Sequence, residues 1–205
     1  MILGSSVTGA VVALAVLVTT IAACRPGPPE AADYVSKVAA SRAAKDQQFK
    51  STNRPLPESR KAKFLPLAYY PIDPDYNVPG VLKLAREQPT LMMPTSTGGQ
   101  RQMRRVGSIE FTVQNQRMKL TAFIEVGAPD MNLLFVPFTD ATNGTETYSA
   151  GRYLDLNRNA AGAYDVDFNY AYLPYCYFNE TYECPYPPAE NRLPLPIYAG
   201  ERLKP

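Results

Sequence analysis

The clearest structural signal in the chain is Ile109-Glu-Phe-Thr-Val-Gln-Asn-Gln-Arg-Met-Lys-Leu-Thr-Ala-Phe-Ile-Glu125. Apolar and polar residues alternate on both sides of the short polar segment 114–117. Successive side chains of a strand point to opposite faces, so this alternation predicts two strands that each bury one face. The polar segment between them predicts an antiparallel hairpin.

Strand signals continue on both sides of this hairpin. Residues 90–94 and 101–106, joined through Ser96-Thr-Gly-Gly99, predict a second hairpin, and the apolar run 131–138 predicts a central strand. Pro137 lacks a backbone donor, which limits pairing at one end of that strand. Many short strands beside one helix predict a mainly β fold, either an antiparallel β-sandwich or a partly open β-barrel.

The chain before these strands is expected to supply the helix. Residues 30–50 place one stripe of side chains at helical spacing, and alanine fills much of the remainder. The stripe consists of Tyr34, Val38, Ser41, Lys45 and Phe49. Because the stripe is thin, we expect the helix to pack on the outside of the domain. The proline-punctuated residues 52–79 are expected to wrap the core.

The chain after these strands is rich in proline. Proline fixes φ and lacks a backbone donor, so residues 186–197 are predicted to be extended. We expect this C-terminal segment to lie across the domain and to cover a sheet edge or the mouth of a pocket. Its prolines, with the one that precedes it, are Pro185, Pro187, Pro188, Pro194 and Pro196.

The first residues have the features of an export signal. Residues 1–23 contain no charged side chain and hold an apolar run at 11–18. The following Ile21-Ala-Ala-Cys24 resembles the bacterial lipobox, and this resemblance implies cleavage before Cys24 and acylation of its thiol. The leader lacks an early Lys or Arg, and a plain membrane-spanning helix is the alternative. A lipid anchor would place the protein at the cell envelope, on the inner or the outer membrane.

Three parts of the chain are therefore predicted. They are a lipoprotein signal peptide at 1–23, a Pro/Gly tether at 24–30 and a single β-rich domain at 31–205. The domain is of ordinary size for a single unit with its own core. The oligomeric state is not predicted.

Composition excludes several classes of function. The chain has 205 residues, 14 tyrosines and no histidine, which excludes Ser-His-Asp and Cys-His catalysis and zinc sites that use histidine. A net charge of +2 does not indicate a nucleic-acid-binding surface. The segment Asp140-Ala-Thr-Asn-Gly-Thr-Glu146 lacks EF-hand spacing and is expected to form a turn. We therefore expect no metal, no cofactor and no nucleic-acid partner.

Two rows of polar residues are the main candidates for a site. If residues 146–155 are extended, Glu146, Tyr148 and Arg152 share one face. If residues 165–172 form a strand, Asp165, Asp167 and Asn169 share the face opposite to a core face of Val166, Phe168, Tyr170 and Tyr172. Facing rows would form a pocket in which Arg152 binds an anionic group and a crowded carboxylate acts as acid or base.

The alternative is that these rows face solvent, or that Arg152 forms an ion pair with Asp167 or Glu190 and fixes the C-terminal segment. The catalytic candidates are Glu146, Tyr148, Arg152 and Asp167. The binding candidates are Asp140, Asp165, Asn169, Tyr172, Glu190, Asn191 and Arg192.

Two cysteines remain once Cys24 is assigned to lipid. In an exported protein, Cys176 and Cys184 are predicted to form a disulfide across a short aromatic loop. Reduced, buried thiols are the alternative, and two sulfur ligands are too few for a typical zinc site.

Several ordered motifs resemble the domain of unknown function 1684 family. They are Tyr69-Tyr-Pro-Ile-Asp-Pro74, Leu134-Phe-Val-Pro-Phe-Thr-Asp140, Glu146-Thr-Tyr-Ser-Ala-Gly-Arg-Tyr-Leu154, Asp167-Phe-Asn-Tyr-Ala-Tyr172, Cys184-Pro-Tyr-Pro-Pro188, Glu190-Asn-Arg-Leu193 and Ala199-Gly-Glu201. The resemblance covers most of the chain after about residue 40 and departs from the pattern at Leu173. It implies no activity, cofactor or substrate.

Three functional hypotheses follow. The first is an envelope module that binds a small ligand or a partner through a tyrosine-lined surface. The second is a hydrolase-like enzyme that uses the carboxylates, Tyr148 and Arg152. The third is a structural envelope protein. The enzyme hypothesis requires Glu146, Arg152 and Asp167 to converge on one cavity.

Overall fold

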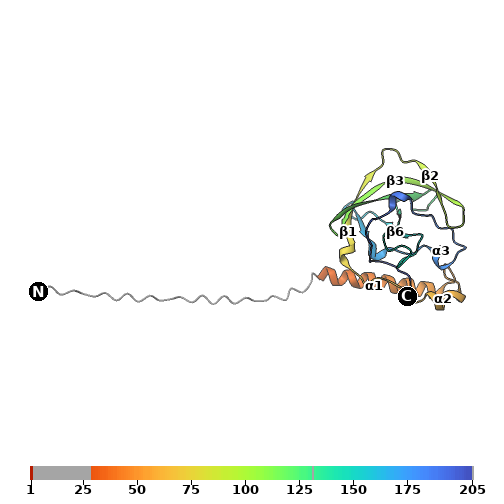
Figure 1. Ribbon diagram of the computed structural model, residues 1–205, viewed down its shortest axis with the longest axis horizontal. Coiled ribbons are helices and arrows are strands. Elements are labelled where there is room, and N and C mark those ends of the chain that lie inside the picture. The colour runs from red at the N-terminus through yellow and green to blue at the C-terminus, as the bar shows by residue number, and fades with distance from the viewer. Residues whose placement is uncertain (2–28, 131, 205) are drawn as a thin grey trace.

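Seven strands form a nearly closed antiparallel barrel in the computed structural model, which describes Met1, residues 29–130 and residues 132–204 (Figure 1). The order around the sheet is β6-β5-β4-β3-β1-β7, and β2 pairs with β3 outside this path. An isolated bridge between Arg158 and Tyr164 links the end strands. The strands are β1 Asn77–Leu84, β2 Thr90–Pro94, β3 Gln100–Val113, β4 Gln116–Glu125, β5 Leu134–Phe138, β6 Arg152–Leu156 and β7 Tyr164–Asp167. The mainly β, barrel-type fold predicted from the sequence is confirmed.

The predicted central hairpin is β3 and β4. Its turn is tighter than the four-residue polar segment indicated, because Val113 already pairs with Gln116. Gln114 and Asn115 have φ values of 50° and 59°, the left-handed conformation of a two-residue hairpin turn. The inward face of the two strands is the centre of the main core, formed by Ile109, Phe111, Val113, Leu120, Ala122 and Ile124.

The outward face of this hairpin is also covered at one end. Phe123 alternates with core residues and points away from them, yet it is fully buried. It packs with Met93 of β2 and Met103 of β3 in a separate apolar cluster. The predicted hairpin of β2 and β3 therefore supplies both a sheet extension and the cover for Phe123.

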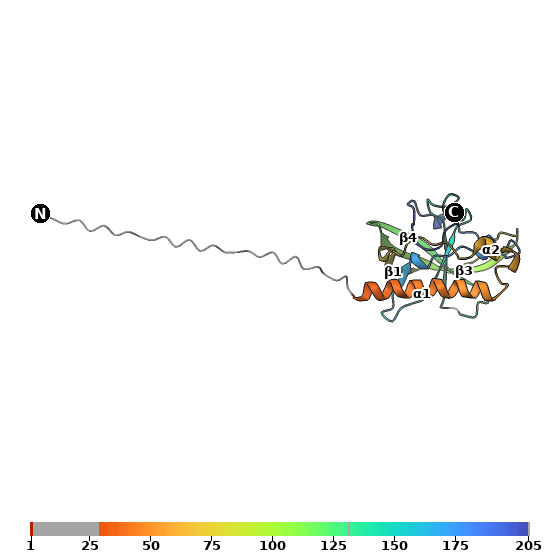
Figure 2. The ribbon, with the colours of Figure 1, turned by 90° about the horizontal axis from the view of Figure 1, so that it is seen from below.

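Helix α1, Pro29–Ser51, lies across one side of the barrel, as Figure 2 shows. Val38 and Phe49 of the predicted stripe are fully buried, while Tyr34 and Lys45 are half-buried against the domain. Ser41 of the predicted stripe is exposed, so the docking face consists of the other four residues. The other short helices are α2 Glu58–Phe64, α3 Tyr175–Phe178, η1 Pro74–Tyr76, η2 Phe168–Tyr170 and η3 Ala189–Asn191. None of the helices in the described residues has the length and hydropathy needed to cross a bilayer.

The C-terminal segment was predicted to cover a sheet edge or the mouth of a pocket. In the structure its side chains also enter the barrel core. Leu193, Leu195, Ile197 and Ala199 alternate inward and belong to the main core. Hydrogen bonds to the chain after β5 continue the sheet, since the Leu193 N–H donates to the Thr139 carbonyl at 2.8 Å. The prolines between these residues keep the segment extended, so every second side chain reaches the core.

Two stretches predicted as strands are shorter than expected. Only Arg152–Leu156 of residues 146–155 forms a strand, and the preceding residues form turns. The strand of residues 165–172 ends at Asp167 because its carboxylate accepts a hydrogen bond from the Asn169 N–H and caps η2. Tyr170 is consequently exposed and does not lie in the core. The predicted signal peptide and Cys24 lie outside the described residues.

Candidate functional site

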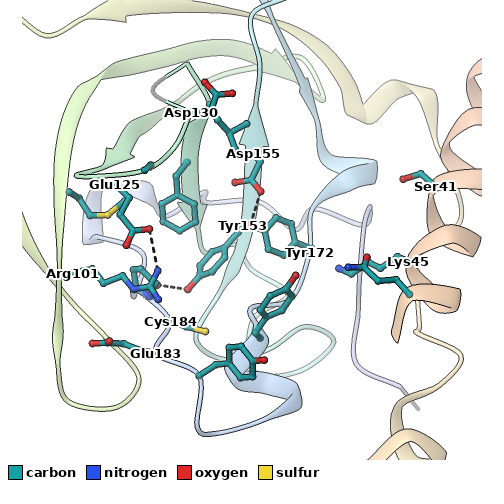
Figure 3. A pocket seen from close by; sticks show the side chains of 18 of the residues that line it. Ser41, Lys45, Arg101, Glu125, Asp130, Tyr153, Asp155, Tyr172, Glu183 and Cys184 are labelled. Atoms are coloured by element: carbon teal, nitrogen blue, oxygen red, sulfur yellow. Dashed lines mark hydrogen bonds and ion pairs between the residues drawn. The ribbon is translucent and has the colours of Figure 1, made fainter. Parts of the chain in front are cut away.

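A cavity of about 650 Å³ lies between α1 and the barrel (Figure 3). One wall is α1, which contributes Ser41, Ala44, Lys45 and Gln48. The floor is apolar and comes from the sheet and the turn before β5, with Met103, Leu133 and Phe135. The remaining wall and rim contain most of the polar and aromatic groups, namely Arg101, Glu125, Ala128, Asp130, Tyr153, Asp155, Tyr172, Tyr175, Tyr182, Glu183, Cys184 and Pro185.

Four tyrosines form the aromatic wall. Tyr153 packs edge-on against Phe135 and Tyr172, with ring centroids 4.8 Å and 5.6 Å apart. Tyr175 and Tyr182 form a second edge-on pair at 5.5 Å. Burial raises the pKa of Tyr153 and of Tyr172 well above the ordinary tyrosine value, so both phenols stay neutral donors. Such interlocked rings give the cavity a rigid apolar side.

Asp155 brings a carboxylate into this aromatic surrounding. It is the outward-facing residue between buried Leu154 and Leu156 in β6. Tyr172 donates its hydroxyl hydrogen to Asp155 Oδ2 at 2.9 Å, as Figure 3 shows. Asp155 is exposed at the rim, yet partial desolvation by the surrounding protein raises its pKa, and the Tyr172 hydrogen bond and the charge of Lys45 oppose this shift.

Both cations of the cavity lining are already in ion pairs. Lys45 of α1 pairs with the buried carboxylate of Glu201, and its Nζ lies 5.1 Å from the centroid of the Tyr172 ring. Arg101 pairs with Glu125 at 3.3 Å. Both cations among the described residues of the lining therefore already have a carboxylate partner.

Arg152, the predicted anion-binding residue, does not line the cavity. It is fully buried and pairs with Asp140 Oδ2 at 2.7 Å. It also donates to the carbonyls of Ile197, at 2.8 Å, and of Ala199. The guanidinium thus ties the C-terminal segment to the barrel. This was the alternative role proposed from the sequence, with Asp140 as the partner in place of Asp167 or Glu190.

Asp167 and Asn169 belong to the docking site of α1. The Tyr34 hydroxyl donates to Asp167 Oδ2 at 2.8 Å, and Asn169 Nδ2 donates to the Tyr34 oxygen at 2.8 Å. Burial raises the pKa of Asp167, and the hydrogen bonds that its carboxylate accepts from Tyr34 and Asn169 oppose this shift. The pair fixes the first turns of the helix and lies away from the cavity lining.

Glu146 and Tyr148 lie in the turns before β6. Glu146 accepts a hydrogen bond from the Tyr70 hydroxyl at 3.2 Å, and Tyr148 packs on Tyr177 with ring centroids 5.3 Å apart. Neither lines the cavity. Glu146, Arg152 and Asp167 therefore do not converge on it, because the strand predicted for residues 146–155 begins only at Arg152.

The other binding candidates have separate positions. Asn191 is buried and donates to the carbonyls of Thr121, at 2.9 Å, and Pro137, at 2.7 Å, so it bridges β4 and β5. Glu190 pairs with Arg105 at the surface. Asp165 and Arg192 are exposed. Among the residues singled out from the sequence as site candidates, Tyr172 and Cys184 line the cavity.

The predicted disulfide is not present. Cys176 and Cys184 are buried free thiols, and the Cys176 N–H donates to Cys184 Sγ at 3.1 Å. The hydrogen bond between the two thiols lowers the pKa of Cys176 and raises that of Cys184. Spacing in the sequence correctly brought the two residues together, but proximity alone does not decide whether they are oxidised. Within the described residues, no group of three or more Cys, Asp or Glu side chains is placed to hold a metal ion.

Sequence patterns left most of the cavity lining unmarked. Asp155 could have been noticed as a charge between two buried leucines of one strand. Lys45 could have been noticed as a charge within the packing stripe of a helix. Arg101, Tyr175 and Glu183 come from three other segments, and no local pattern connects them.

Comparisons with known proteins agree with this architecture. The solution NMR structure of an uncharacterised protein from Haloarcula marismortui is similar, with a TM-score of 0.66 and 31% sequence identity. The similarity covers 85% of this chain and 96% of that chain. No curated protein matches the sequence. A family model described as "Protein of unknown function (DUF1684)" matches residues 62–202, and the chain therefore belongs to the DUF1684 family.

Proposed function

We propose that this protein is a small-molecule-binding module of the cell envelope. The cavity between α1 and the barrel carries the proposal. Its volume of about 650 Å³ lies within the usual range of roughly 300–1,000 Å³ for ligand sites. An apolar floor, rigid tyrosine walls and a few polar groups at the rim are the usual composition of such sites.

The proposal includes a lipid anchor at Cys24. Support comes from the uncharged leader and the small-small-Cys ending of the export signal. Two or three acyl chains would hold the protein firmly at a bilayer. Helix α1 begins at Pro29, within the predicted tether, and contributes one wall of the cavity, so the binding site would lie close to the anchor along the chain.

Binding is tested by protein-observed NMR with a fragment library that contains cations, anions and neutral compounds. We expect hits to shift the signals of Tyr172, Asp155 and neighbouring residues. Ala44→Phe should weaken binding and reduce these shifts, because Ala44 lines the cavity and a phenyl ring there would occupy part of it. Ala43→Phe is the matched control, since Ala43 is exposed on the same helix and does not line the cavity. Hits that are insensitive to Ala44→Phe, or no hits near the cavity, would refute the proposal.

The anchor is tested by mass spectrometry of the membrane fraction. We expect an N-terminal peptide that begins at an acylated Cys24 and loss of membrane attachment in Cys24→Ser. An intact Met1 terminus on the membrane-bound protein would contradict the anchor and leave the ligand-binding proposal unaffected.

A further inference from the structure

The charges around the cavity are unequal. Its two cations, Lys45 and Arg101, are each held in an ion pair, with Glu201 and Glu125 respectively. Within the described residues, no ion pair reaches the other three carboxylates of the lining, those of Asp130, Asp155 and Glu183. The cavity therefore carries negative charge that the described side chains do not neutralise by direct pairing.

The side-chain hydrogen-bond donors to Asp155 and Glu183 are neutral, and the charge of Lys45 acts on Asp155 from a distance without forming an ion pair. Asp155 accepts from the Tyr172 hydroxyl at 2.9 Å, and Glu183 accepts from the Thr95 hydroxyl at 2.9 Å. A hydroxyl donor orients a carboxylate without cancelling its charge. Because an ionised carboxylate offers about four acceptor positions, each group keeps capacity for a further donor. Asp155 is exposed and lines the cavity, so its remaining acceptor positions are accessible to a positive group.

The aromatic wall favours the same sign of charge. The face of a tyrosine ring carries negative electrostatic potential and attracts cations within about 6 Å of its centroid. One cation already occupies such a position, since the Lys45 ammonium lies 5.1 Å from the Tyr172 centroid and 5.5 Å from that of Phe49. The rings of Tyr175 and Tyr182 extend the aromatic surface along the rim.

The floor determines what kind of cation fits. Met103, Leu133 and Phe135 present apolar surface that a hydrated metal ion cannot use, and the acids are not grouped as metal ligands within the described residues. Resting on the proposed binding function, we infer that the natural ligand is an organic cation with an apolar or aromatic body, whose ammonium group contacts Asp155 and the tyrosine wall. The apolar body lies on the floor beneath it.

The test uses benzyltrimethylammonium as the probe, with benzyl alcohol and benzoate as neutral and anionic comparisons. Calorimetry and NMR are applied to the full chain, and the chemical shifts of residues 29–130 and 132–204 are followed. We expect the cation to bind in the cavity at least about tenfold more tightly than either comparison, which corresponds to one charge-assisted contact. Raising the salt concentration should weaken the binding of the cation only.

Asp155→Asn is the informative variant, because the amide keeps an acceptor for Tyr172 and removes the charge. We expect it to lower the affinity for benzyltrimethylammonium about tenfold. Asp165→Asn is the matched control, since Asp165 is an exposed acid outside the cavity lining, and its affinity should equal that of the wild type. Both variants are checked for an unchanged fold by NMR.

Three comparisons of affinity would overturn the inference. They are equal binding of the neutral probe, preferential binding of benzoate, and equal affinity of Asp155→Asn and Asp165→Asn for the cation. If the neutral probe binds equally or benzoate binds preferentially, NMR shifts confined to the cavity would still support the binding function while excluding a cationic ligand. Absence of all three probes from the cavity would overturn the ligand class, and the fragment library then decides the binding function separately.

Discussion

Asp155 is a carboxylate held where its charge is unfavourable. Its folded-state pKa is raised above the ordinary 3.8, so the folded protein binds more protons than the unfolded chain between these two values. The stability contributed by this group is therefore full at low pH and is lost as pH rises through the folded pKa. Carboxylates in functional sites often have a raised pKa, because the environment that prepares them to bind a ligand also lowers the stability of the folded protein.

This argument predicts a pH-dependent effect of Asp155→Asn. At neutral pH the variant should be at least as stable as the wild type, since it lacks the ionised carboxylate whose pKa is raised in the folded state. Below about pH 3 the two proteins should have the same stability, because Asp155 is then protonated in both states. Thermal unfolding followed by circular dichroism at several pH values measures the difference. The prediction would be contradicted if the stability of the variant relative to the wild type decreased between acidic and neutral pH.

Arg152 has a structural role, because its guanidinium is buried and paired with the Asp140 carboxylate. Replacing it by Met leaves the Asp140 carboxylate buried without its cation and frees the carbonyls of the C-terminal segment. Arg152→Met should lower the free energy of unfolding by about 3 to 5 kcal/mol. Urea unfolding measures this loss. Arg86→Met, at an exposed arginine, is the control and should change stability by less than about 0.5 kcal/mol.

At the scale of elements, α1 is attached largely through polar contacts. Arg42 donates to the Tyr70 carbonyl at 2.8 Å, and Asp46 accepts from the Leu67 N–H at 2.9 Å. The family match begins at residue 62, so the helix lies outside the matched range although it forms a wall of the cavity. Its attachment therefore decides whether the cavity is complete.

The main apolar contact at the end of α1 is Phe49, which is 1% exposed and packs edge-on against Phe178. Phe49→Ala should cost about 3 kcal/mol and should appear first as faster hydrogen exchange along α1. Val35→Ala is the control, because Val35 lies on the same helix and is 38% exposed. Equal exchange in the two variants would contradict the assigned role of Phe49.

The irregularity in β3 is a second decisive element. The register between β3 and β4 shifts between Arg105 and Gly107, where β3 also passes close to β1. A Cβ atom on Gly107 would lie 2.2 Å from the Lys83 carbonyl oxygen. Gly107→Ala should therefore lower stability by about 1 to 3 kcal/mol in urea unfolding, whereas Ser108→Ala next to it should have little effect.

At the scale of the whole molecule, the barrel is completed by a segment far from it in sequence. Leu195, Ile197 and Ala199 enter the main core, and Arg152 holds their backbone. Removing residues 194–205 should abolish cooperative thermal unfolding and the near-ultraviolet tyrosine signal, because the core is then open. Removing only residues 204–205 should preserve both. A cooperative transition in the longer truncation would show that the barrel is stable without this segment.

Local periodicity explains which parts of the fold could be predicted. Alternation along residues 109–125 and spacing along α1 are properties of neighbouring residues, and the hairpins and the docking face of the helix follow from them. The turns before β6 carried no such period. The extended conformation assumed for Glu146 and Tyr148 was therefore wrong, and with it the polar row that those residues were to form.

Local patterns were sufficient to predict the hairpins, the outer helix and the family motifs, because each depends on residues close together in the chain, and the export signal stays a prediction. The pairing of Arg152 with Asp140, the free thiols of Cys176 and Cys184, and the lining of the cavity became visible in the folded arrangement. The physical reason is that charge pairing and cavity shape depend on distances between segments. Lys45, Arg101 and Asp155 become neighbours only after the helix, the barrel and the C-terminal segment have packed together.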